Sequence, residues 1–147
     1  MPRRALVLIA LALGGCTAEP SPTATPPVTD EQVCRSLISA VPSTVDHEAE
    51  SARSEFAVAW GDPPIVLRCG VEVPSAYGPT SEMLVVNKVS WFAQQQPDGY
   101  VFTAVGRTPL VSVQVPDTHQ PEVNPLVDLA PVMLEQTQVS GPAGAAP

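Results

Sequence analysis

The chain has few basic residues and no apolar run long enough to cross a bilayer. Its 147 residues include seven Lys and Arg against fifteen Asp and Glu, a formal charge of −8. Nucleic-acid binding depends on basic side chains that neutralise phosphates, so this composition argues against a nucleic-acid partner. The apolar run Ala5 to Leu13 is nine residues long, whereas a membrane-spanning helix needs about 20. We therefore expect no transmembrane helix.

Motifs of common catalytic sites are also missing. The sequence contains no Gly-Xaa-Ser-Xaa-Gly elbow, no Ser-Xaa-Xaa-Lys and no Gly-rich phosphate loop. Its two histidines, His47 and His119, lie in polar stretches without the spacing of a known metal site. We expect both to be solvated surface side chains, and we predict neither a metal nor a cofactor.

The N-terminus has the features of a lipoprotein signal. Arg3 and Arg4 precede the apolar run, which is too short to span a bilayer but suits a secretory signal peptide. Leu13-Gly14-Gly15-Cys16 is typical of a lipobox, which predicts a signal peptide over residues 1–15 and a lipid on Cys16. The protein is then held on the extracytoplasmic face of the cell membrane through this anchor. The alternative is an ordinary signal peptide with a chance cysteine near its cleavage site.

Removal of the signal peptide makes the mature chain more acidic. It takes away Arg3 and Arg4 but no acid, and so leaves five Lys and Arg against fifteen Asp and Glu, a formal charge of −10. This negative charge disfavours docking of the protein on anionic lipid headgroups beyond the anchor itself. The charge is explained either by solubility or by an acidic recognition face.

Cysteine is scarce, and this makes the pairing simple. With Cys16 lipidated, only Cys34 and Cys69 remain. Two thiols in an oxidising compartment are expected to form a disulfide. Cys34 falls on the apolar face of a predicted helix, and Cys69 alternates with Ile65 and Leu67 on a predicted strand, so both point towards the core. The alternative is a pair of unlinked buried thiols.

Composition divides the mature chain into a tether, one domain and a tail. Residues 16–27 comprise the lipidated cysteine and a Pro- and Thr-rich segment, which predicts a flexible tether. Residues 138–147 are expected to be a disordered tail. The intervening residues 28–137 are enough for a single globular domain with one core.

Hydrophobic periodicity predicts the order helix, strands, helix. Thr29 to Gln32 fits a capping box, and the helix it begins ends at Pro42; a second helix begins at Asn124. Alternating segments between them predict strands at 55–60, 65–71, 83–92, 100–105 and 110–115. The expected fold class is α+β: a two-layer sandwich of about five largely antiparallel strands packed with an N-terminal and a C-terminal helix, with one disulfide.

A few polar and aromatic residues form a candidate ligand site. Trp60, Asp62, Arg68 and Trp91 would line a groove for a polar ligand, with indole faces against sugar or peptide. The structural alternative is that the tryptophans fill the core while Asp62 holds the turn before Pro63-Pro64, which also suits a cis bond. Arg107 is expected to be either a turn cap or an anion contact.

The string Ala59 to Gly70, AWGDPPIVLRCG, resembles the signature of the actinobacterial domain-of-unknown-function 3515 family of predicted lipoproteins. The likeness extends to Cys34, Val89-Ser90-Trp91, Gly106-Arg107 and Val113-Gln114-Val115-Pro116, and covers roughly residues 28–136. It implies a cell-envelope location and these domain boundaries. It supplies no catalytic residues.

Together these features predict a lipid-anchored, non-enzymatic binding or assembly module of the cell envelope. Its partner would be an envelope protein, a cell-wall component or a lipid component. One alternative is an envelope enzyme that uses carboxylates, with Asp62 as one of them. The other is a structural spacer.

Overall fold

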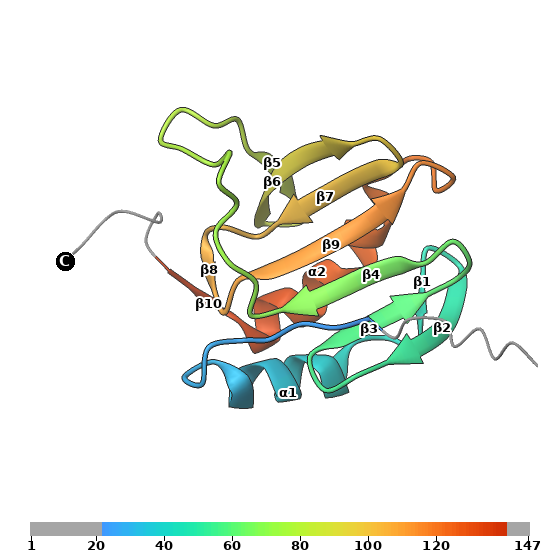
Figure 1. Cartoon of the computed structure of the whole chain (residues 1–147), viewed down its shortest axis with the longest axis horizontal. Helices are drawn as coiled ribbons and strands as arrows, with labels where there is room; N and C mark the ends of the chain where they lie inside the picture. Colours follow the sequence, from blue (N-terminus) through green and yellow to red (C-terminus); the bar gives the residue numbers. More distant parts are fainter. Residues whose placement is uncertain (1–21, 141–147) are drawn as a thin grey trace, which may run out of the picture.

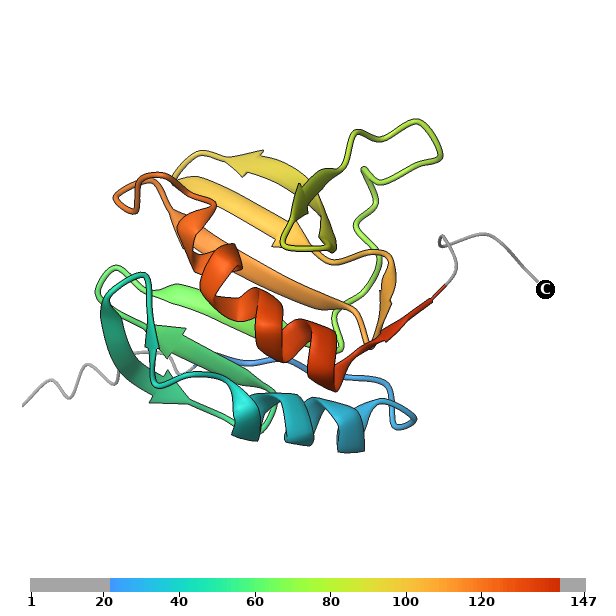
Figure 2. The same cartoon turned by 180° about the vertical axis from the view of Figure 1, so that it is seen from behind.

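Two helices cover one face of an antiparallel sheet (Figures 1 and 2). The computed structural model describes residues 22–140. The predicted signal peptide, the lipidation site Cys16 and the end of the predicted tail after Ser140 lie outside the described residues. Within residues 22–140, no helix is long and apolar enough to cross a membrane.

Eight strands form the main sheet in the order β1-β2-β3-β4-β9-β7-β6-β5, with antiparallel pairing throughout. Two further short strands, β8 and β10, pair with each other. The elements are α1 (Glu31–Ala40), β1 (Thr44–Val45), β2 (Glu48–Arg53), β3 (Ala57–Trp60), β4 (Ile65–Cys69), β5 (Leu84–Val86), β6 (Val89–Gln96), β7 (Gly99–Thr103), β8 (Arg107–Thr108), β9 (Val111–Pro116), α2 (Asn124–Gln136) and β10 (Gln138–Val139).

The predicted α+β architecture, with two helices and an antiparallel sheet, is confirmed, but the prediction of about five strands was too low. β1 and β2 were missed because β2, EAESAR, carries no apolar face for the alternation to reveal. The predicted strand 83–92 is two strands joined by a turn at Asn87–Lys88, where both residues have positive φ. That turn contains no glycine, so it lacked the usual signal of a tight hairpin.

The core lies between the helices and the covered face of the sheet. Helix α1 buries side chains at helical spacing, namely Cys34, Leu37 and Ile38. Helix α2 also buries one face, with Leu126, Leu129 and Met133. The inward residues of β3, β4 and β9 alternate along each strand and complete the core: Val58, Trp60, Ile65, Leu67, Cys69, Val111, Val113 and Val115.

The predicted capping box does not form. Helix α1 begins at Glu31 with Asp30 at its N-cap and without a side-chain cap. The Thr29 hydroxyl instead donates a hydrogen bond to the Asp30 carboxylate, at 3.3 Å. The chain enters the helix through a turn in which the Asp30 N–H donates to the Pro27 carbonyl.

The predicted disulfide between Cys34 and Cys69 is confirmed. It joins α1 to the central strand β4, with the two Cα atoms 5.5 Å apart and both side chains fully buried. In the chain-entropy account, cross-linking a loop of this length destabilises the unfolded state by about 4 kcal/mol.

The N-terminal segment lies on the sheet face that the helices leave open (Figures 1 and 2). Pro22 and Pro26 are buried, and Pro26 packs against Gly70 at the end of β4. The tether predicted over residues 16–27 is therefore packed on the domain from Pro22 onward. The predicted tail also needs correction, because Gln138–Val139 pair with β8.

Candidate functional site

The structure divides the predicted groove residues between the two faces of the sheet. Trp60 is fully buried beneath the helices, where its indole N–H donates to the Pro42 carbonyl at 3.0 Å. Asp62 and Arg68 instead line a groove on the open face. The alternation of β4 explains the separation, because Arg68 precedes the inward-facing Cys69. The hypothesis of one groove lined by both tryptophans was wrong. Trp60 fills the core, as the structural alternative expected.

Trp91 and Arg107 are also structural. Trp91 is fully buried, and its indole N–H has no hydrogen-bond partner among the described residues. Arg107 is only 7 % exposed, and its guanidinium donates to both the side-chain hydroxyl and the carbonyl of Thr137, the C-cap of α2. Cations at helix C-termini satisfy free carbonyls and oppose the negative end of the helix dipole. Arg107 is therefore a cap rather than an anion contact.

The groove on the open face has a volume of about 840 Å³. Its lining comes from four strands of the sheet, from the turns at one end of it, and from Pro22 and Thr23 of the N-terminal segment. The strand residues are Ser51 and Ala52 of β2, Ala59 of β3, Val66 and Arg68 of β4, and Gln114 and Pro116 of β9.

Arg68 is the cation of this groove. Its guanidinium is half-buried and donates to the Gln114 side-chain oxygen at 3.2 Å. Among the described residues no carboxylate lies within ion-pair distance of it. Burial lowers the pKa of Arg68, because the charged form loses solvation. A guanidinium has five N–H donors, so most of those on Arg68 remain available to a ligand.

Three carboxylates share the groove with Arg68. Asp62 lies in the β3–β4 turn, Asp98 in the β6–β7 turn, and Asp117 directly after β9. The backbone N–H of Asp117 donates to the Asp98 carbonyl at 2.9 Å, which links two of these segments. Asp98 and Asp117 were not predicted as groove residues, because strand pairing between segments distant in the sequence brings them together. The groove can therefore contact an anionic and a cationic group of one ligand.

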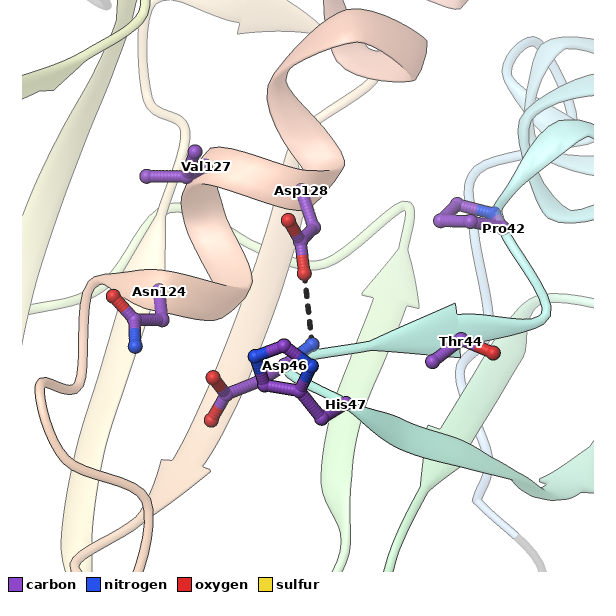
Figure 3. A pocket seen from close by; sticks show the side chains of 7 residues that line it. All are labelled: Pro42, Thr44, Asp46, His47, Asn124, Val127 and Asp128. Carbon is purple, nitrogen blue, oxygen red and sulfur yellow. Dashed lines mark hydrogen bonds between the residues drawn. The ribbon is translucent and has the colours of Figure 1, made fainter.

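A second hollow, of about 560 Å³, lies beside the N-terminus of α2 (Figure 3). Asp46 and His47 reach it from the β1–β2 turn, where both have positive φ. The Asp46 N–H donates to the Asp128 carboxylate at 2.8 Å. Among the described residues, no group of three or more His, Cys, Asp or Glu side chains is placed to hold a metal ion.

His119 connects this hollow to the groove. Its Nδ1 lies 3.3 Å from a carboxylate oxygen of Asp46, and its Nε2 lies 3.2 Å from the Pro63 carbonyl in the β3–β4 turn. The His119 side chain is only 10 % exposed, so the expectation of a solvated histidine was wrong there, whereas His47 is exposed. His119 therefore lies between the β1–β2 turn and the β3–β4 turn and contacts both. The Asp62–Pro63 bond in the same turn is cis.

Comparisons with known proteins identify one relationship. The sequence matches a family described as "Protein of unknown function (DUF3515)" over residues 5–140. No significant match was found among curated proteins or among solved structures.

Proposed function

The chain belongs to the DUF3515 family, and we propose that it is a lipid-anchored, non-enzymatic binding module on the extracytoplasmic face of the cell membrane. Two features support this location: the lipobox that ends at Cys16 and the disulfide between Cys34 and Cys69. Disulfides persist in oxidising compartments outside the cytosol. Small extracytoplasmic domains also use them to add stability to a limited core.

The observation that carries the binding role is the half-buried guanidinium of Arg68 in an open groove. A buried charge without an ionic partner costs free energy, and a ligand with a carboxylate or phosphate removes that cost. A free anion would be repelled by Asp62, Asp98 and Asp117, which line the same groove. The best-matched ligand therefore also carries an ammonium group, as a short peptide does.

A peptide also fits the shape and composition of the groove. Ala59 and Val66 provide a small, apolar floor between the charged groups. Ligand sites commonly combine such apolar surface with a few polar groups that fix orientation. The partner would be an envelope protein or a peptide-bearing wall component.

The first experiment measures binding of N-acetyl-lysyl-trialanine, which has one ammonium group and one carboxylate, to the purified lipidated chain by calorimetry. We expect Arg68→Gln to weaken binding about tenfold to a hundredfold, because hydrogen bonds to charged groups contribute about 1.5–3 kcal/mol. Arg35→Gln is the matched control, since Arg35 is exposed and paired with Glu31 and Glu55. Equal binding by wild type and the Arg68 variant, or undetectable binding by wild type, contradicts the proposal.

The anchor needs its own test. Cys16→Ser removes the sulfur that carries the lipid, so the variant should move from the membrane fraction to the soluble fraction. A single acyl chain binds membranes only marginally, while two or more anchor stably. Membrane retention unchanged by this substitution would count against lipidation.

A carboxylate-dependent enzyme is the second candidate, because Asp62 shares an open groove with two other carboxylates. Acid–base catalysis needs two placed groups with different proton affinities. Incubation of the purified chain with wall-derived peptides and glycans distinguishes the two functions. Turnover that Asp62→Asn abolishes would establish the enzyme and exclude the non-enzymatic module.

A further inference from the structure

The position of Pro22 limits how far the groove can lie from the membrane. Cys16 and Pro22 are separated by six Cα–Cα steps. An extended chain advances at most about 3.3–3.6 Å per residue, so Pro22 lies within about 20 Å of the lipidated residue. This limit applies to the mature chain and rests on the proposed lipid anchor.

Pro22 is itself part of the groove wall. It is buried, and Pro22 and Thr23 line the groove together with Arg68. The segment that follows is held in place where Pro26 packs against Gly70. The short connection to the anchor therefore ends at the ligand site, and the groove is kept close to the bilayer.

The opposite end of the sheet lies farther from the anchored segment than the groove does. The loop between β4 and β5 projects there, far from the β3–β4 turn (Figure 1). A domain of this size has a diameter of about 35 Å, so a groove on the far side would lie well beyond the reach of the six-residue connection.

We infer that the groove faces the membrane and binds an extended polypeptide segment of a membrane-bound partner, next to the bilayer surface. Two observations favour a polypeptide over a lipid headgroup. The open sheet face already holds an extended segment of this chain, Pro22–Pro27, outside any helix or strand. The mature chain also carries a charge of −10, which opposes close docking on anionic headgroups.

Lipid-linked peptides of two lengths test this arrangement. The lipidated chain is placed in phosphatidylcholine vesicles that carry lysyl-trialanine coupled through its α-amino group to a lipid, with a spacer of about 20 Å or about 60 Å. Groove occupancy is measured against free N-acetyl-lysyl-trialanine, with Arg68→Gln as the specificity control. Confinement of the peptide and the protein to one membrane surface raises the effective concentration of the peptide at the groove. This happens only when the spacer is long enough to reach from the lipid to the groove. We expect both spacers to strengthen apparent binding at least tenfold.

The outcomes separate this inference from the proposed function. Strengthening by the long spacer alone would place the groove away from the membrane and overturn the inference, while the binding module would stand. Loss of free-peptide binding on addition of peptide-free phosphatidylethanolamine vesicles would identify a headgroup as the occupant and overturn the polypeptide assignment. Absence of free-peptide binding in solution would remove the proposed function and, with it, this inference.

Discussion

Pro26 lies against Gly70 so closely that a Cβ atom at position 70 would be 2.0 Å from the Cβ of Pro26. Gly70 also has φ of +78°, a conformation that other residues adopt only at a cost. One glycine at the end of β4 thus permits both a backbone turn and the seating of the N-terminal segment. We therefore expect the groove wall formed by Pro22 and Thr23 to depend on this contact.

Gly70→Ala should destabilise the domain and release the N-terminal segment. The positive φ alone costs about 1–2 kcal/mol for a residue with a Cβ, and the contact with Pro26 adds to it. Gly78→Ala is the control, because a Cβ there meets no atom within 4 Å. Urea unfolding gives the stabilities, and protease cleavage before Val28 reports release of the segment. Equal unfolding midpoints for the two variants would contradict this account.

Reduction of the Cys34–Cys69 disulfide should lower the free energy of unfolding by about 4 kcal/mol, because it restores the conformational freedom of the unfolded chain. The two cysteines are 35 positions apart. Urea unfolding of the Cys34→Ser, Cys69→Ser double variant measures the loss, with Cys16→Ser as the single-cysteine control. A midpoint unchanged in the double variant would show that the cross-link adds no stability.

His119→Ala should destabilise the domain by about 1–3 kcal/mol, since it leaves the partly buried Asp46 carboxylate and the Pro63 carbonyl without their partner. His47→Ala is a matched control in the same region, because His47 is exposed, and surface substitutions usually change stability by no more than about 0.5 kcal/mol. Thermal unfolding distinguishes them. Similar melting temperatures for both variants would mean that the His119 contacts do not hold the loops.

The ion pair between Glu50 and Arg53 should stabilise the folded domain at neutral pH but not in acid. Its carboxylate accepts hydrogen bonds from Arg53 at 2.6 and 2.8 Å, and Arg53 also donates to the Ile38 carbonyl of α1. The bond from Arg53 lowers the pKa of Glu50. Because the folded pKa is the lower one, the stabilisation is present above the unfolded value of about 4.3 and is lost as the pH falls through the folded value.

Glu50→Gln should therefore reduce stability near neutral pH by up to about 1 kcal/mol, the usual range for an exposed ion pair. The difference from wild type should close as the pH falls from neutral through the lowered pKa of Glu50. Urea midpoints measured across this range test the expectation, with Glu72→Gln as the control, since Glu72 is exposed. A difference that persists unchanged in acid would show that the ion pair is not its source.

The sequence predicted those parts of the fold in which local pattern and burial agree. Alternation in Ile65–Cys69 and helical spacing around Cys34 located the disulfide and the two layers. Strand β2 could not be found in this way, because its partner β3 and not its own composition makes it a strand. The packing of Pro22–Pro27 depends on a gap at Gly70 that exists only after folding.

Some individual residues of the groove could be predicted from the sequence, but their arrangement in space could not. Asp62 and Arg68, proposed as lining residues of one groove, both line the groove on the open face. For Trp60 and Trp91 the sequence left open a binding surface or the core, and the face of the sheet on which they fall places them in the core. Asp117 could not be assigned to the groove because it is far from Asp62 in the sequence. Pairing of β9 with β4 brings it to the same end of the sheet as Asp62.

The cross-link between α1 and β4 also determines how the protein would carry mechanical tension. In the proposed lipid-anchored form, a pull on the anchor enters from the N-terminal side of Cys34 and crosses the sulfur bridge to Cys69, one peptide bond from Arg68. A ligand held by Arg68 would close that force path without loading residues 35–67. Strands β1, β2 and β3 would remain unstrained while the anchor and the bound ligand are pulled in opposite directions.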